Sequence, residues 1–102
     1  MSDIKILEQR ALEIRHKYDA LNRGKSGQPW DALKLAKGFK KDVSDLIAIL
    51  EEGSFSEKKL SHELGDCLWS VLVIARKLDI DLEKSFWTTM GEIEQRFKDG
   101  TA

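Results

Sequence analysis

Apolar residues recur along the chain at intervals of three and four, which is the spacing of one face of an α-helix. The first such stretch predicts a helix of about 19 residues. The segment that follows, residues 22–30, contains two glycines, a serine and the only proline of the chain, so we expect a loop there. The apolar positions of the first helix are Ile4, Leu7, Ala11, Ile14, Tyr18 and Leu21.

A second helix is predicted from Asp31 to about Glu52. Asp31 is a suitable N-cap, Trp30 before it is placed to pack on Leu35, and Gly53 is a suitable C-terminal stop. Its apolar positions again follow intervals of three and four: Ala32, Ala36, Phe39, Val43, Leu46 and Leu50.

Two further helices complete the pattern. Ser56 is placed to cap a third helix that runs to about Leu78, and its apolar residues cover more than half of its circumference. Asp79 or Asp81 is placed to cap a fourth helix, with Gly100 beyond its end. The residues of the fourth helix that we expect to point inward are Leu82, Phe86, Trp87, Met90, Ile93 and Phe97.

The predicted fold is all-α, because no segment alternates apolar and polar residues as a strand would. We expect residues 1–102 to form a single domain, a four-helix bundle-type protomer with the third helix at its centre. The third helix is more apolar than three neighbours in so small a chain can cover. We therefore expect a homodimer, or a higher oligomer such as a homotetramer, with the second and third helices packed across the interface. A monomer with an exposed apolar patch is the alternative.

Composition narrows the class of protein. Of the 102 residues 34% are charged, and the net charge is −1 with Lys and Arg dispersed, so we expect no nucleic-acid partner. The single cysteine, Cys67, excludes an intrachain disulfide and fits a reducing compartment. The start of the chain does not resemble a signal peptide, and the longest weakly charged stretch, residues 64–75, is too short to span a bilayer. We expect a cytoplasmic protein without a membrane partner.

Four acidic residues are the strongest candidates for chemistry. Asp66 is the only charged residue in the apolar run 64–75, and Glu63 lies one turn before it on the same helix face. Asp42 and Asp45 repeat this i, i+3 spacing on the second helix. Carboxylates gathered at partial burial need a cation or a raised pKa, and an all-oxygen set suits Mg²⁺ or Mn²⁺. We expect no Lys or Arg among them on the same faces.

The acid spacing also has a plain explanation, because about three i, i+3 acid pairs arise by chance in a chain of this acidity and exposed pairs commonly lie on a solvated face. Asp66 fits that explanation least, since its neighbours in sequence are apolar. Nucleophilic catalysis is not indicated, because Ser44 and Ser70 have no base at a recognisable spacing. His62 is interpreted as a surface residue, and Trp69 and Trp87 as core residues.

The acidic motifs resemble those of the MazG-like nucleotide pyrophosphohydrolases, an all-α superfamily that acts on nucleoside triphosphates. That family has an ExxE motif on one helix and an ExxD motif on the next. Glu63-Leu64-Gly65-Asp66 fits ExxD, and Asp42-Val43-Ser44-Asp45 fits ExxE only if Asp replaces Glu. The resemblance covers residues 37–97 well and the first helix loosely.

The resemblance implies a reaction and a set of residues. Family members hydrolyse a nucleoside triphosphate to the monophosphate and pyrophosphate, often to remove non-standard or surplus nucleotides, and generally work as dimers or tetramers. It implies that Asp42, Asp45, Glu63 and Asp66 hold Mg²⁺, with Mn²⁺ as a possible substitute, and that one acid of the Asp42/Asp45 pair orients the attacking water. Aspartate is one methylene shorter than glutamate, so metal affinity and activity are expected to be reduced or even lost.

Substrate contacts are less defined. Arg96 fits the family's arginine on the last helix, but Thr89 and Ile93 stand where the family often has Lys and Asn. Trp30 is a candidate to stack on the base, and Lys25 in the basic loop is a candidate to contact phosphate. Two alternatives remain: a phosphoribosyl-ATP-type pyrophosphohydrolase, and a helical nucleotide-sensing or interaction module with little turnover.

Overall fold

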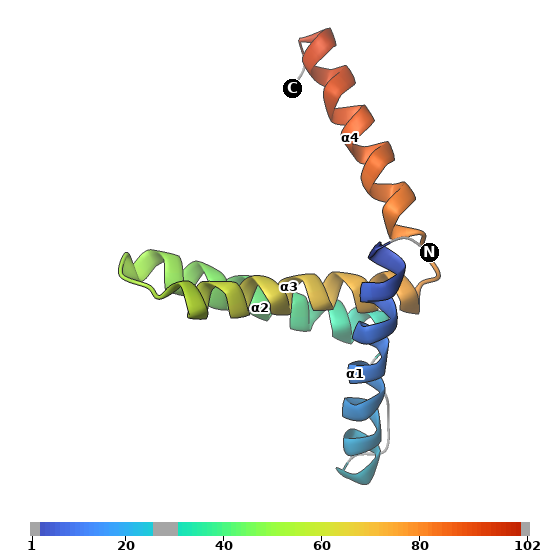
Figure 1. Cartoon of the computed structure of the whole chain (residues 1–102), viewed down its shortest axis with the longest axis vertical. Coiled ribbons are helices and arrows are strands. Elements are labelled where there is room, and N and C mark those ends of the chain that lie inside the picture. The colour runs from blue at the N-terminus through green and yellow to red at the C-terminus, as the bar shows by residue number, and fades with distance from the viewer. Residues whose placement is uncertain (1–2, 26–30, 101–102) are drawn as a thin grey trace.

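The computed structural model of the chain describes residues 3–25 and 31–100. It contains the helices α1 (Asp3–Lys25), α2 (Ala32–Glu52), α3 (Glu57–Lys77) and α4 (Leu82–Asp99), as Figure 1 shows. The described residues include no strand, so the all-α prediction is confirmed. None of the helices in this part of the chain is both long enough and apolar enough to cross a bilayer.

The predicted caps define the ends of α2 and α3. A carboxylate oxygen of Asp31 accepts the backbone N–H of Lys34 at 2.8 Å, and Ser56 Oγ accepts that of Lys59 at 3.1 Å. Gly53 ends α2 in the left-handed conformation, with φ 71°. Each of these residues satisfies a backbone group that the helix end would otherwise leave unpaired.

The turn between α3 and α4 separates the roles of two aspartates. Asp79 adopts a left-handed φ of 54°, which aspartate tolerates better than most residues. Its N–H donates to the carbonyl of Arg76 at 3.2 Å, and that of Ile80 donates to the carbonyl of Ala75 at 2.8 Å. These two bonds form a Schellman motif that ends α3. Asp81, and not Asp79, is the N-cap of α4.

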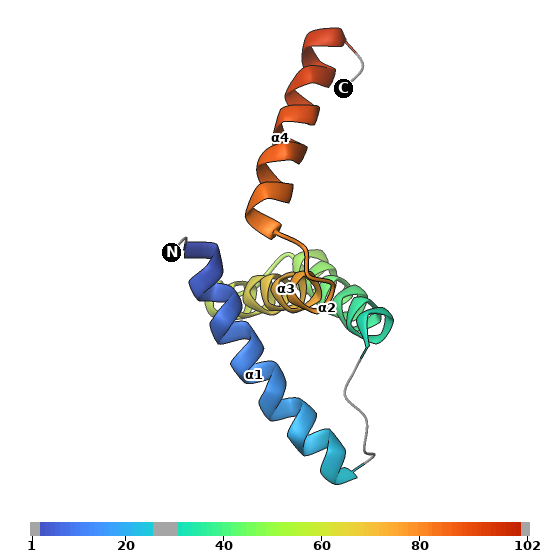
Figure 2. The ribbon, with the colours of Figure 1, turned by 90° about the vertical axis from the view of Figure 1, so that its right-hand side faces the viewer.

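α3 lies at the centre of the packed part of the molecule, as predicted. It packs along α2 as an antiparallel pair, and α1 crosses it near its C-terminal half (Figures 1 and 2). Trp69 of α3 fastens α1, because its indole Nε1 donates to the carbonyl of Ala11 at 3.0 Å. The buried core cluster at this crossing consists of Ala11, Leu35, Leu72 and Val73.

α4 meets this core at its first residue, Leu82, which is partly buried against it. It projects away from the other three helices (Figures 1 and 2), and none of its residues is buried in the described chain. The prediction that its apolar residues point inward is confirmed for Leu82. It is wrong for the other five, which are exposed: Phe86, Trp87, Met90, Ile93 and Phe97. The prediction that the four helices close into a bundle is wrong for the single chain. The exposed fractions are 53% for Phe86, 66% for Trp87 and 72% for Phe97. The reason is that, beyond Leu82, no other helix within residues 3–25 and 31–100 packs along α4.

α1 is longer than its apolar pattern predicted. The helix continues to Lys25, so residues 22–25 are helical and not part of the expected loop. Backbone hydrogen bonds can extend a helix beyond the last residue of its apolar pattern, which here is Leu21. The expected packing of Trp30 on Leu35 lies outside the described residues.

The chain as a whole is extended for its size. Its radius of gyration is 16.4 Å, whereas a compact domain of this length has about 13 Å. Its accessible surface is 7788 Å², whereas a compact chain of 11.7 kDa exposes roughly 5,900 Å². Part of this excess surface is apolar, because the large hydrophobic residues of α4 remain exposed.

Candidate metal and nucleotide site

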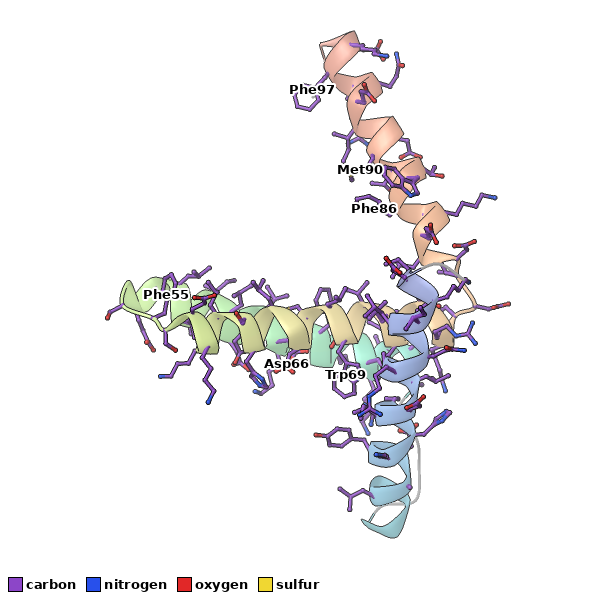
Figure 3. All side chains as sticks on the ribbon, in the orientation of Figure 1. Phe55, Asp66, Trp69, Phe86, Met90 and Phe97 are labelled. Carbon is purple, nitrogen blue, oxygen red and sulfur yellow. The ribbon has the colours of Figure 1, made fainter. Side chains whose placement is uncertain are left out.

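The two predicted acid pairs lie on the antiparallel helices α2 and α3. Asp42 and Asp45 are one turn apart on α2, and Glu63 and Asp66 are one turn apart on α3; all four are half-buried. In Figure 3, Asp66 points to the same side of α3 as Trp69, away from the side toward which α4 projects.

A hydrogen bond between α2 and α3 shows how the two acid pairs are aligned along the helix axes. Ser70 Oγ of α3 donates to Asp42 Oδ2 of α2 at 2.8 Å. From this contact toward the α2–α3 turn, Asp45 lies about 4.5 Å further along α2, and Asp66 about 6 Å further along α3. Since the helices are antiparallel and adjacent, the two pairs follow one another along the helix pair, with Asp45 and Asp66 at levels that differ by only about 1.5 Å.

The pKa of Cys67 is raised by partial burial and by acidic residues of both helices. Partial burial raises the pKa of the Cys67 thiol, and the negative charges of Asp42, Glu63 and Asp66 raise it further, in that order. Carboxylates from both helices therefore act on one group between them. The thiol stays protonated near neutral pH and is a poor nucleophile.

Asp45 differs from the other three acids. Lys41 Nζ lies 3.2 Å from Asp45 Oδ2, one turn away on α2. The expectation that no Lys or Arg shares these faces is therefore wrong for Asp45, because the i, i+4 spacing brings the lysine alongside. Asp66 is also less enclosed than its apolar neighbours suggested, with 37% of its side chain exposed.

His62 joins the α3 acid pair. Its Nε2 lies 3.3 Å from Asp66 Oδ2, and one ligand atom each of His62, Glu63 and Asp66 lies within 4.8 Å of the other two. Two oxygens on opposite sides of one Mg²⁺ are about 4.2 Å apart, so this spacing fits a single cation after small side-chain rotations. His62 is exposed, as predicted, and it also lies beside Asp66. Its i, i+4 spacing from Asp66 was the available signal.

A cavity of about 290 Å³ adjoins the acids where α1 meets the helix pair. Asp42 and Ser70 line its edge, and Trp69 and Tyr18 form an aromatic wall with ring centroids 5.7 Å apart. The guanidinium of Arg15 lies 5.8 Å from the Trp69 ring centroid. The cavity thus combines flat apolar surface with two cationic side chains, Arg15 and Lys41, next to a carboxylate.

A second, more open hollow of about 620 Å³ lies toward the α2–α3 turn. Glu63 and His62 line it together with Lys58 and Lys59. The two lysines were not among the predicted substrate contacts. They add positive charge next to the α3 acid pair.

The sequence model of the MazG nucleotide pyrophosphohydrolase domain matches residues 33–101, about two thirds of the chain. The chain belongs to the MazG family. Comparison with curated proteins and with solved structures gives no significant match.

The MazG match covers both acid pairs and α4, whereas α1 lies outside it. The aromatic cavity is thus shared between the MazG region, which supplies Trp69, and α1, which supplies Tyr18 and Arg15. Trp69 is partly buried against the core, as predicted, but Trp87 is exposed and is not a core residue in the single chain.

Among the predicted substrate contacts of this MazG protein, Arg96 alone has a described side chain. Trp30 lies outside the described residues, and so does the side chain of Lys25, although its backbone ends α1. Arg96 is exposed near the end of α4, which projects away from the acids. The single chain therefore does not bring Arg96 to the carboxylates.

Proposed function

We propose that the protein hydrolyses a nucleoside triphosphate to the monophosphate and pyrophosphate in a Mg²⁺-dependent reaction, as a house-cleaning enzyme. The observation that carries the proposal is the pairing of Asp42/Asp45 with Glu63/Asp66 on adjacent antiparallel helices, inside the region that matches the MazG domain. A triphosphate needs charge neutralisation and positioning for phosphoryl transfer. These four carboxylates, called the acidic face below, can hold the cations that supply both.

The donors present fit a hard divalent cation. Glu63 and Asp66 offer carboxylate oxygens and His62 a nitrogen, all within 4.8 Å of one another, and Asp42 adds a carboxylate from α2. Oxygen donors suit Mg²⁺ and Mn²⁺, and an imidazole nitrogen shifts preference toward Mn²⁺. When bound, the cation neutralises phosphate charge and increases the acidity of water.

The residues of the chain have separate tasks in this proposal. A water oxygen forms a bond to the α-phosphorus while the bond to the pyrophosphate oxygen breaks, and the water proton passes to a carboxylate of the Asp42/Asp45 pair. Asp42 suits this role by position, because it lies between the acidic face and the aromatic cavity. Asp45 is instead ion-paired with Lys41, so its carboxylate already has a partner.

In this proposal, the two hollows bind opposite ends of the substrate. The cavity beside Asp42 offers Trp69 and Tyr18 to a nucleobase, which stacks well on aromatic rings. On the other side of the acids, Lys58 and Lys59 offer charge to the outgoing pyrophosphate. In this arrangement the α-phosphorus lies over the carboxylates.

We also propose that the active form is a homodimer or a larger homo-oligomer. The excess exposed surface of roughly 1,900 Å² over a compact chain is more than one partner's share of a standard interface, about 800 Å². Phe86, Met90, Ile93 and Phe97 follow intervals of four, three and four along α4, which is the seam of a helix that packs on another helix. Figure 3 shows Phe86, Met90 and Phe97 on the same side of α4. A second copy would also allow Arg96 to reach a neighbouring site.

The decisive test is release of pyrophosphate by the parent and by Asp66→Asn. We expect the parent to release pyrophosphate from at least one of a panel of common and modified nucleoside triphosphates with Mg²⁺ or Mn²⁺. Asp66→Asn should lose at least about a hundredfold, because even residues that only orient metal ligands contribute 10- to 100-fold. Asp99→Asn, which makes the same chemical change at an exposed site on α4, should keep full activity.

Other outcomes select other functions. Hydrolysis confined to phosphoribosyl-ATP would replace the substrate and keep the site. A rise in melting temperature with nucleotide and metal, without any product, would identify a sensing module. The ion pair between Lys41 and Asp45 favours this second candidate over a fully active site, because the lysine competes with a metal for Asp45.

A further inference from the structure

Serine side chains inside the helices behave in two ways. Ser44 and Ser85 donate to the backbone carbonyl four residues earlier, at 3.0 and 2.9 Å. This local bond is the usual choice of a helical serine. Ser70 instead donates to Asp42, which is 28 residues away on another helix, at 2.8 Å. Its hydroxyl therefore serves a tertiary contact at the edge of the acidic face.

The acceptor explains why this contact forms. A carboxylate accepts a stronger hydrogen bond than a peptide carbonyl does, and the bond is further strengthened because both side chains are half-buried. The hydroxyl occupies one lone pair of Asp42 Oδ2. Oδ1 and the second lone pair of Oδ2 remain available to another ligand.

The two acids of α2 are held in different ways. Asp45 is held by the ammonium group of Lys41, which neutralises its charge. Asp42 is held by a neutral hydroxyl, which fixes the plane of the carboxylate and leaves its negative charge in place. Only the second arrangement orients an acid for a cation without competing with that cation.

We infer that Ser70 is a positioning residue whose hydroxyl holds the Asp42 carboxylate in the orientation that binds the divalent cation. The inference rests on the proposed function. Mg²⁺ and Mn²⁺ require ligand oxygens at closely defined directions, and a short aspartate with a freely rotating carboxylate meets that requirement only part of the time. The bond from α3 removes this freedom and couples the direction of Asp42 to the helix that carries Glu63 and Asp66.

The test is Mn²⁺ binding to the full chain, measured by isothermal titration calorimetry without nucleotide. Ser70→Ala should weaken Mn²⁺ binding by about 10- to 100-fold, and Ser70→Thr, which keeps the hydroxyl, should bind within about threefold of the parent. Ser44→Ala is the matched control, because it removes a hydroxyl from a serine near the acids that bonds only to its own helix. It should bind Mn²⁺ as the parent does.

Kinetics add a readout that a purely structural role would not change. For Ser70→Ala, the Mn²⁺ concentration that gives half of the maximal rate should rise by the same factor as the dissociation constant, with a smaller change in kcat at saturating Mn²⁺. Ser70→Ala binding within about twofold of the parent, or folded Ser70→Thr binding as weakly as Ser70→Ala, would overturn the inference. A parent that binds Mn²⁺ without hydrolysis refutes only the proposed reaction; a parent that binds no Mn²⁺ refutes both proposals.

Discussion

Helices α3 and α4 show how one sequence pattern leads to two structural outcomes. Both carry apolar residues at intervals of three and four, and both have an aspartate or serine cap. In α3, Leu72 and Val73 are 4% and 3% exposed because α1 and α2 cover them. In α4, Phe86 and Phe97 are 53% and 72% exposed.

The difference teaches that amphipathic spacing indicates a face to be covered and does not indicate which chain covers it. α3 is covered on one side within its own chain, because a short turn returns it along α2, whereas its Leu64 and Leu68 stay 52% and 46% exposed. α4 leaves α3 through the Asp79 turn, which directs it away from the core. The α1–α3 region is thus the folding core, and α4 is the arm that we propose a second copy covers.

The largest expected effect concerns the arm. Met90→Lys together with Ile93→Lys places two charges in the middle of the α4 seam. We expect the oligomer to dissociate with a rise in Kd of at least about a hundredfold, because central apolar contacts contribute about 2 kcal/mol or more each. Sedimentation velocity over a concentration series measures the change.

The control places the same charges on the opposite face of the arm. Thr88→Lys together with Gln95→Lys should leave the assembly intact. Equal dissociation by both pairs, or a parent that is monomeric at high concentration, would contradict the role given to α4.

The next effect concerns the core. Leu72→Ala should reduce the free energy of unfolding by about 2–5 kcal/mol, because it leaves a cavity in the buried cluster. Leu68→Ala, one turn earlier on α3 at a side chain that is 46% exposed, should cost far less. Each substitution is made in the Met90→Lys/Ile93→Lys protein. Urea unfolding then compares Leu72→Ala with Leu68→Ala without a contribution from assembly. Equal losses would show that Leu68 has an apolar environment that the single chain does not show.

The smallest effect concerns how α1 is fastened to α3. Trp69→Phe keeps an aromatic ring near Tyr18 but removes the indole N–H that donates to Ala11, so we expect a loss of about 1 kcal/mol in unfolding free energy. Trp87→Phe changes an exposed ring on α4 and should have almost no effect on the unfolding of the monomeric variant. A larger loss from Trp87→Phe would show that α4 folds back on its own chain.

Local features of the fold were predictable from the sequence because they depend on near neighbours. Asp31, Ser56 and Gly53 act within one turn of the helix ends that they define, and Gly100 ends α4 as predicted. The direction of α4 was not predictable in this way. It depends on which of Asp79 and Asp81 caps the helix and which takes a left-handed backbone, and both have the same side chain.

In the candidate site, too, features set by near neighbours were predictable and long-range contacts were not. The i, i+3 acid pairs were visible in the sequence, and the i, i+4 partners Lys41 and His62 follow from helix geometry. The bond from Ser70 to Asp42 joins residues far apart in the chain, so its existence depends on how α2 and α3 align. No local spacing encodes that alignment.

The Schellman turn at Asp79 has a consequence for how copies of the chain recognise each other. Its backbone bonds fix the exit angle of α4 before any encounter, so association does not require the arm to become ordered first. The symmetry of the assembly, and hence the separation between neighbouring acidic faces, then depends largely on one backbone angle. Related sequences that change this turn would build differently shaped assemblies from almost the same helices.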